Sequence, residues 1–251
     1  MAPDGWYLKG GFALELRLGG KARSTKDVDI DWTVGLEQAI GLLLDATAHD
    51  SDDPFKFTVQ RVSAEPIDAD GGERWTARAD LAGREFERVA LDIGFGKPPV
   101  VTPDSLASSS LLDFAGIAAV TVPALAIEQH LAEKLHAYTR TYAGDRRSSR
   151  VKDLVDIAVI AHTTTVDGDR LRVATTSIFD RRATHDLTPK LPTPPPDWAR
   201  PWATLTEHLP AEADLASGFR AAAAFWDPQL AGETAAMVWD PSAASWQPSS
   251  P

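Results

Sequence analysis

The sequence predicts an α+β fold in which a strand-rich core is followed by a helical region. Several segments of the first half alternate polar and apolar residues with a period of two, which is typical of strands. The second half carries apolar residues at helical spacing and contains a proline-rich stretch. Segregated strands and helices are typical of α+β proteins. We expect a core over residues 1–123 and a helical region over residues 124–251, which ends in a tryptophan-rich tail.

The expected elements follow from this periodicity. In the first half we expect helices at 12–18 and 36–48, and strands at 26–32, 55–62, 74–81 and 85–95. The last two strands flank Ala82-Gly83-Arg84, which predicts a hairpin. In the second half we expect helices at 125–142, 151–161, 171–182 and about 212–226. The prolines of 189–201 are expected to break regular structure.

The amino-acid composition excludes several classes of protein. The 251 residues include no cysteine, which excludes disulfides and thiolate metal sites. No apolar run approaches the ~20 residues that span a bilayer. The first residues lack the pattern of a signal peptide, so we expect a cytoplasmic protein with no membrane partner. The net charge of −11 opposes a protein that coats nucleic acid over its whole surface.

A local basic island offsets this acidic balance. Between residues 134 and 152 there is one acid, Asp145, against the basic residues Lys134, Arg140, Arg146, Arg147, Arg150 and Lys152. Such an island can bind phosphate backbones through displaced counterions. It can equally be a solvated run of charge.

The segment 26–32 places acids on one side of a predicted strand. Asp27, Asp29 and Asp31 are spaced by two, so their carboxylates project from the same face. Carboxylates this close repel one another unless a cation neutralises them. A hard, oxygen-ligated ion such as Mg²⁺ (or Mn²⁺) does so and keeps positions open for phosphate oxygens. The alternative is an exposed strand face that happens to be acidic.

A pair of glycines precedes this acidic strand. Gly10-Gly11 lies where a helix is expected to begin, and glycine lets backbone N–H groups approach a phosphate closely. A double glycine by itself is usually a turn. Next to an acidic strand, it indicates a phosphate cradle beside a metal site.

A third carboxylate belongs to a different predicted strand. Asp92 interrupts the apolar run 89–93, and an unpaired charge is costly to bury. It is either a hydrogen-bonded structural residue or the third ligand of a two-metal site. In the second case one metal orients a triphosphate and the other lowers the pKa of an attacking hydroxyl. Asp92 is then also the expected general base.

These motifs together resemble those of the AbiEii-type nucleotidyltransferase toxins. The resemblance covers Tyr7–Asp156 and continues more weakly through 179–182 to the tail. It is carried by three sets of residues: Leu8-Lys9-Gly10-Gly11-Phe12-Ala13-Leu14; Arg23-x-Thr25-x-Asp27-Val28-Asp29; and Glu128, Ala132-Glu133-Lys134-Leu135-His136-Ala137, Arg140 and Arg150-x-Lys152-Asp153-Leu154-Val155-Asp156.

The resemblance implies a polymerase β-like core, which is a mixed sheet flanked by helices. It implies an enzyme that uses a nucleoside triphosphate (NTP) and divalent metal. It also implies the toxin half of a toxin–antitoxin pair, with a separately encoded antitoxin of the transcription-regulator type. Some relatives transfer nucleotides to the 3′ end of tRNA, so tRNA is the expected acceptor.

The family motifs assign the site residues one by one. Asp27 and Asp29 are the metal pair, while Asp31 also fits the acid–apolar pattern and stays ambiguous. Lys134 matches the triphosphate-binding lysine and Asp156 the downstream acid; with Asp27, Asp29 and Asp92 they form the expected catalytic set. The expected nucleotide-binding residues are Lys9, Gly10, Gly11, Thr25, Lys134 and Lys152.

Helix geometry allows other interpretations of two of these residues. Lys134 shares a helical face with Ile127, Leu131 and Tyr138, so its ammonium either reaches outward or faces a buried anion. Lys152 and Asp156 are four apart, which also fits an ion pair on a helix surface.

Three functions remain open at this level. The first is nucleotidyl transfer to RNA, and the second is the same chemistry on a small molecule or a protein side chain. The third is a catalytically degenerate nucleotide-binding or antitoxin-binding module. The intact carboxylate set opposes the third function, and the short segment before Lys9 favours it.

Overall fold

The computed structural model describes residues 5–49, 54–62, 72–108, 119–140, 150–209 and 214–249. Within these residues the chain forms two compact units. The first unit draws on residues 1–17, 24–99 and 103–125, and the second on residues 18–23, 100–102 and 126–251. The division into a core over residues 1–123 and a helical region over residues 124–251 stays a prediction.

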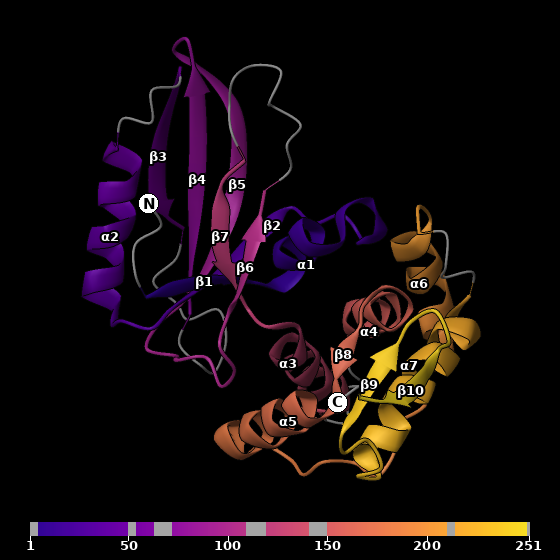
Figure 1. The fold of residues 1–251 in the computed structure, drawn as a ribbon. Helices are drawn as coiled ribbons and strands as arrows, with labels where there is room; N and C mark the ends of the chain where they lie inside the picture. The colour runs from indigo at the N-terminus through magenta and orange to yellow at the C-terminus, as the bar shows by residue number, and fades with distance from the viewer. Residues whose placement is uncertain are drawn as a thin grey trace. The chain divides into compact units, whose positions relative to one another are not determined.

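The first unit is built on a mixed sheet (Figure 1). The described part of the chain contributes seven strands in the order β3-β4-β5-β2-β1-β7-β6. Two neighbouring pairs, β2 with β5 and β1 with β7, are parallel, and the others are antiparallel. The strands are β1 (Trp6–Lys9), β2 (Asp27–Trp32), β3 (Phe55–Arg61), β4 (Glu73–Leu81), β5 (Arg84–Gly94), β6 (Asp104–Ala107) and β7 (Thr121–Ala124).

One face of this sheet is apolar and carries both described helices of the first unit. Helix α2 (Leu36–Ala48) packs Ala39 against a cluster that contains Trp32, Trp75 and Leu91. Helix α1 (Gly10–Leu18) packs on the same face, because Val28 and Ile30 contact the clusters of both helices. Since side chains alternate along each strand, the intervening polar residues of β2, β4 and β5 project from the opposite face.

The turn between β4 and β5 confirms the predicted hairpin and shortens its loop. Leu81 pairs with Arg84, so only Ala82 and Gly83 form the turn. Both have positive φ, at 50° and 77°, as the tight two-residue turns of twisted hairpins require.

The second unit combines helices with a small sheet (Figure 1). Its helices are α3 (Ile127–Thr139), α4 (Val151–Thr163), α5 (Gly168–Arg182), α6 (Ala199–Thr206) and α7 (Leu215–Leu230). Helix α4 is buried over most of its length, as the apolar periodicity predicts. Strands β8 (Val166–Asp167), β9 (Met237–Asp240) and β10 (Ser245–Pro248) form an antiparallel sheet in the order β10-β9-β8.

Three details of this unit add to or differ from the expectations. The tail supplies β9 and β10, which were not predicted. The proline-rich stretch is irregular over 189–195, as predicted, but its last residues enter α6, which begins at Ala199 with Pro201 in its first turn, where no intrahelical N–H bond is lost. Helix α7 runs past Trp226 and includes Pro228. These differences do not alter the fold class, which is α+β as predicted.

Tryptophans attach the tail to the second unit. The Trp239 indole N–H donates to the Ala161 carbonyl at 2.7 Å, and its ring packs edge-on against Phe225 at 5.1 Å. The Trp246 indole N–H donates to the Phe225 carbonyl at 2.9 Å. These rings are therefore anchors, as expected from the sequence.

We predict that Trp239→Ala lowers the free energy of unfolding by about 3–5 kcal/mol, because a buried ring and its hydrogen bond are lost. Urea unfolding followed by circular dichroism measures this change. Val173→Ala on α5, where the side chain is half exposed, is the matched control and should change the stability by about 0.5 kcal/mol or less. Equal effects of the two substitutions would contradict the anchoring role.

Candidate functional site

A row of four charged residues crosses the polar face of the first unit. The strand register places Lys9 of β1 opposite Asp29 of β2, and Asp29 opposite Asp92 of β5. Asp92 in turn lies opposite Arg74 of β4. The two acids of the row therefore belong to adjacent parallel strands, although 63 positions separate them in the sequence. A basic residue stands at each end.

Asp31 is a structural residue rather than part of this row. It is only 3% exposed, it forms an ion pair with Lys9 at 2.7 Å, and it accepts a hydrogen bond from the Tyr7 hydroxyl at 3.3 Å. Gly94 lies opposite Asp31, and a Cβ at that position would come within 2.1 Å of its carboxylate. This packing favours Asp29 over Asp31 as the metal ligand, and the choice stays a prediction. Lys9 faces a carboxylate here, and its nucleotide-binding role stays a prediction.

Gly10 gives space to the Asp29 carboxylate. It joins β1 to α1 with a φ of 65°, a conformation that favours glycine. A Cβ there would come within 1.8 Å of Asp29 Oδ2. Gly11 follows as a buried residue of α1. The glycine turn therefore lies directly against the acidic strand, and its role as a phosphate cradle stays a prediction.

Asp27 lies at the beginning of β2 and is exposed. The register pairs it with Ala90, so it projects from the same face as Asp29 and Asp92. The Thr25 hydroxyl donates to the Asp27 carbonyl at 3.4 Å, which orders the entry to the strand. The nucleotide-binding role of Thr25 stays a prediction.

Asp92 is held by Arg74 through two hydrogen bonds. Arg74 Nε donates to Asp92 Oδ1 at 2.7 Å, and Arg74 Nη2 donates to Oδ2 at 2.6 Å. These hydrogen bonds and the charge of Asp92 raise the pKa of the Arg74 guanidinium above its ordinary value, with smaller contributions from Asp27 and Asp29. The sequence analysis missed Arg74, and its alternation with Trp75 and Thr76 along β4 was the available signal.

The carboxylates at this site are of a chemical type that suits a divalent metal, but the present orientations of their side chains suit it less well. Asp27, Asp29 and Asp92 are hard oxygen donors on one face of adjacent strands, and the space left by Gly10 adjoins Asp29. Among the described residues, however, no three acidic or histidine side chains lie close enough together to hold an ion. Asp92 points its two oxygens at Arg74 instead. The backbone arrangement fits the metal, and one side chain is engaged elsewhere.

A polar groove of about 650 Å³ lies over β3, β4 and β5. Its polar lining comes from Thr58, Gln60, Arg61, Thr76, Arg78 and Arg88. Arg78 lies opposite Thr58 and Arg88, and Thr76 lies opposite Ala90, which is the partner of Asp27. The groove therefore adjoins the carboxylates on the same face of the sheet.

The second unit contains a separate charged cluster around Lys134. The buried Lys134 ammonium lies 2.6 Å from Asp156 and 3.4 Å from Asp153. Arg23 donates to both oxygens of Asp156, at 2.9 and 3.1 Å. The anion that Lys134 faces is therefore the Asp156 carboxylate, which joins α3 to α4.

In this cluster, burial and the charge of the opposite partner shift the pKa values in opposite directions. Burial alone lowers the pKa of Lys134, but the carboxylates of Asp156 and Asp153 outweigh it and leave the pKa above its ordinary value. Burial raises the pKa of Asp153, and the charge of Lys134 offsets this only in part. Lys134 is thus a firmly charged residue in the folded protein.

The remaining basic residues of the island are described only in part. Lys152 is exposed on α4, while Asp156 bonds Arg23 and Lys134, so the alternative of a surface ion pair between Lys152 and Asp156 does not hold. Arg146 and Arg147 lie outside the described residues, so the basic island stays a prediction. The nucleotide-binding role of Lys152 also stays a prediction.

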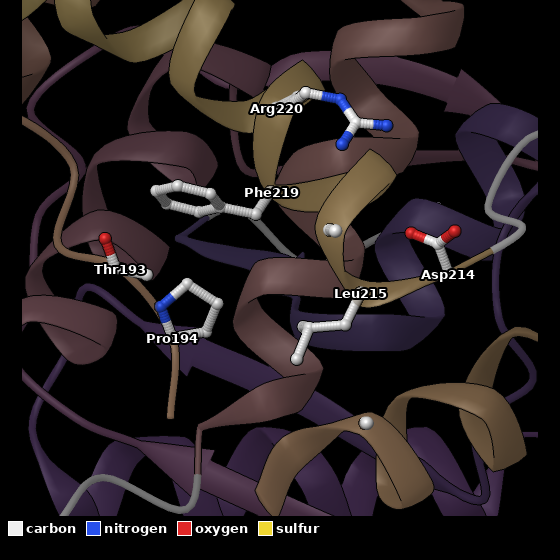
Figure 2. Close-up of a pocket in the computed structure, with 8 residues that line it drawn as sticks. Thr193, Pro194, Asp214, Leu215, Phe219 and Arg220 are labelled. Atoms are coloured by element: carbon white, nitrogen blue, oxygen red, sulfur yellow. The ribbon is translucent and has the colours of Figure 1, made fainter. Parts of the chain in front are cut away.

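An apolar pocket of about 530 Å³ lies at the start of α7 (Figure 2). It is formed by Leu215 and Phe219 of that helix and by Thr193 and Pro194 of the proline-rich segment. None of the predicted site residues lines this pocket. No helix among the described residues is both long and apolar enough to cross a membrane.

Comparison with protein families decides the family. The pattern of the family described as "Nucleotidyl transferase AbiEii toxin, Type IV TA system" matches residues 2–227. The chain belongs to this family. The resemblance drawn from the sequence motifs is thereby confirmed. None of the curated proteins matches the chain.

One solved structure shares the fold of this AbiEii-family chain. MenT4, a nucleotidyltransferase toxin from Mycobacterium tuberculosis, superposes with a TM-score of 0.51 at 22% identity over 74% of this chain. The chain spans 63% of the length of that structure. A nucleotidyltransferase from H. pylori has 16% identity and a TM-score of 0.45, with 90% of this chain and 87% of that chain covered.

We predict that Lys134→Ala lowers the free energy of unfolding by about 3 kcal/mol at neutral pH, because it removes the buried ammonium that offsets Asp153 and Asp156 and leaves Arg23 as the close partner of Asp156. The folded-state pKa of Lys134 is raised, so its contribution is full below the unfolded pKa and is lost as pH rises through the folded pKa. Urea unfolding at a series of pH values should therefore show wild type and variant converging at alkaline pH. Lys152→Ala is the exposed control. A constant difference across that range would contradict the charge-based account.

Proposed function

We propose that this AbiEii-family chain is a metal-dependent nucleotidyltransferase that transfers a nucleoside monophosphate from an NTP to an RNA acceptor such as the 3′ end of tRNA. The observation that carries the proposal is the register that places Asp29 directly opposite Asp92 on adjacent parallel strands, beside the glycine turn. The family description supports the chemistry. The fold shared with MenT4 is consistent with it.

Three carboxylates would hold the metal, which would be Mg²⁺ or Mn²⁺. Asp27 and Asp29 project from one strand, and Asp92 from its parallel neighbour. A bound divalent ion neutralises the triphosphate and lowers the pKa of the attacking hydroxyl. The protein's own contribution is to fix these donors on a sheet whose other face is packed against α1 and α2.

The reaction follows from this placement. The acceptor hydroxyl oxygen bonds to the α-phosphorus, the bond from that phosphorus to the bridging oxygen breaks, and pyrophosphate leaves. Asp92 takes the hydroxyl proton as general base. Gly10 and Gly11 keep side chains away from the beginning of α1, where backbone N–H groups attract phosphate oxygens. Lys134 and Asp156 form the charged pair that joins α3 to α4. The roles of Lys134 as the triphosphate-binding lysine and of Asp156 as a catalytic acid stay predictions.

The arginines of the polar groove favour an acceptor that carries phosphates. Arg78 and Arg88 line it on the same face as the carboxylates. Their ion pairs with Asp80 and Glu85 are exposed, and such pairs contribute little to stability, so phosphate oxygens can replace the carboxylates. Arginine guanidinium groups suit phosphates because they bind them through paired hydrogen bonds.

The family description also supports the biological role of a toxin. We propose that the chain acts in the cytoplasm and is paired with a separately encoded antitoxin of the transcription-regulator type. In this role, transfer to the 3′ end of tRNA would block aminoacylation and therefore translation.

We predict that Asp29→Ala abolishes transfer of labelled nucleotide to RNA while the protein stays folded, because Asp29 supplies metal-binding oxygens. Incubation of the protein with total tRNA and each labelled NTP in turn measures transfer and identifies donor and acceptor together. Asp180→Ala, an exposed acid on α5, is the control and should retain full activity. Retained transfer by Asp29→Ala would remove the metal assignment. Transfer by wild type to a small molecule or protein instead of RNA would overturn the RNA acceptor.

We predict that the double variant Arg78→Ala, Arg88→Ala weakens the binding of labelled tRNA because the groove loses two phosphate contacts. Fluorescence anisotropy at a series of salt concentrations measures the affinity. The slope of log affinity against log salt should fall by about 1.4 for two contacts to single-stranded RNA. Arg172→Ala, on α5 and ion-paired with Asp169, is the control. An unchanged slope would exclude this groove from acceptor binding.

A further inference from the structure

Arg74 is positioned to act as a cation that competes with the metal. Its guanidinium contacts both oxygens of Asp92, at 2.7 and 2.6 Å. A metal ion would bind these same two oxygens, so Arg74 and the ion compete for Asp92.

The register explains why a cation is needed at this position. Asp29 and Asp92 are neighbours on adjacent parallel strands, and Asp27 projects from the same face. Carboxylates arranged in this way repel one another unless positive charge lies nearby. The ammonium of Lys9 is 2.7 Å from Asp31, so the guanidinium of Arg74 supplies the charge next to Asp92.

The pair is also placed so that it can open. The side chain of Arg74 is 46% exposed and that of Asp92 is 19% exposed. Exposed ion pairs contribute little net stability, so a divalent ion shared among three carboxylates can displace the guanidinium. The flexible arginine side chain then stays at the site, because β4 holds its backbone opposite Asp92.

We propose that Arg74 is a positioning residue that holds Asp92 before the metal binds and contacts the phosphates of the nucleotide after the metal has displaced it. This inference rests on the proposed function. It assigns Arg74 two successive anionic partners, first the Asp92 carboxylate and then a phosphate oxygen. A guanidinium suits both, because each offers paired oxygens at similar spacing. It also accounts for the arrangement in which the backbone fits a metal while Asp92 points away from it.

Metal binding tests the first half of this inference without an activity assay. Mn²⁺ affinity of the wild type and of Arg74→Gln is measured by calorimetry, with Arg172→Gln as a matched surface control. We expect Arg74→Gln to bind Mn²⁺ about five-fold more tightly, the factor that corresponds to one exposed ion pair. Arg74→Lys keeps the charge without the paired hydrogen bonds and should fall between the two. Circular dichroism establishes that each variant is folded.

Nucleotide binding tests the second half. With saturating Mn²⁺, a non-hydrolysable NTP analogue should bind Arg74→Gln about five-fold more weakly, because one phosphate contact is lost. Unchanged or weaker Mn²⁺ binding by Arg74→Gln would overturn the competition. Unchanged analogue binding would overturn the phosphate contact. An absence of Mn²⁺ binding by the wild type and all variants would overturn the metal-dependent function itself, and the inference with it.

Discussion

The parallel pairing of β2 with β5 is the constraint on which the candidate site depends. It aligns Asp29 with Asp92 and Asp31 with Gly94 in one continuous register. A shift by one residue would turn Asp92 toward α2 and Leu91 toward the polar face, because successive side chains of a strand point to opposite faces. The apolar contacts of Leu91 and Ile93 therefore hold the acids in position as effectively as any polar contact does.

Both faces of the sheet follow from a single alternation of residues. Val28 and Ile30 contact the helices that cover one face, and the acids between them project from the other. The same division appears in β4, where Trp75 is buried and Arg74 is half exposed. Fold and site are consequently encoded by alternating positions of the same strands, and the apolar set fixes where the polar set lies through the register.

Much of this arrangement could be predicted from the sequence. Local periodicity located α2, β2 and the hairpin of β4 and β5, and the acids spaced by two indicated the shared face. Family motifs then connected Gly10 and Asp29, which the structure places in direct contact. The structure of short, strongly patterned segments can be predicted because it depends mainly on residues that are close together in the sequence.

The remainder depends on partners that are distant in sequence. The residues around Arg74 indicate only that it projects from the polar face of β4, and its partner Asp92 is set by the register of a hairpin. The strands of the tail were missed because β9 and β10 are short and are stabilised by rings such as Trp239 packing onto α7. Lys134 likewise has its counter-ions on another helix, so its periodicity indicated a buried anion without identifying it.

Asp29 and Asp31 lie on the same face of β2, but their different surroundings make them unequal choices for mutagenesis. Asp31 is enclosed by Tyr7, Lys9 and Gly94, so changing it disturbs the joints between three strands. Asp29 is partly exposed and lies against the glycine turn at Gly10, so shortening it disturbs the packing of the strands less. A variant that is meant to be inactive yet folded should therefore be made at position 29 and never at position 31.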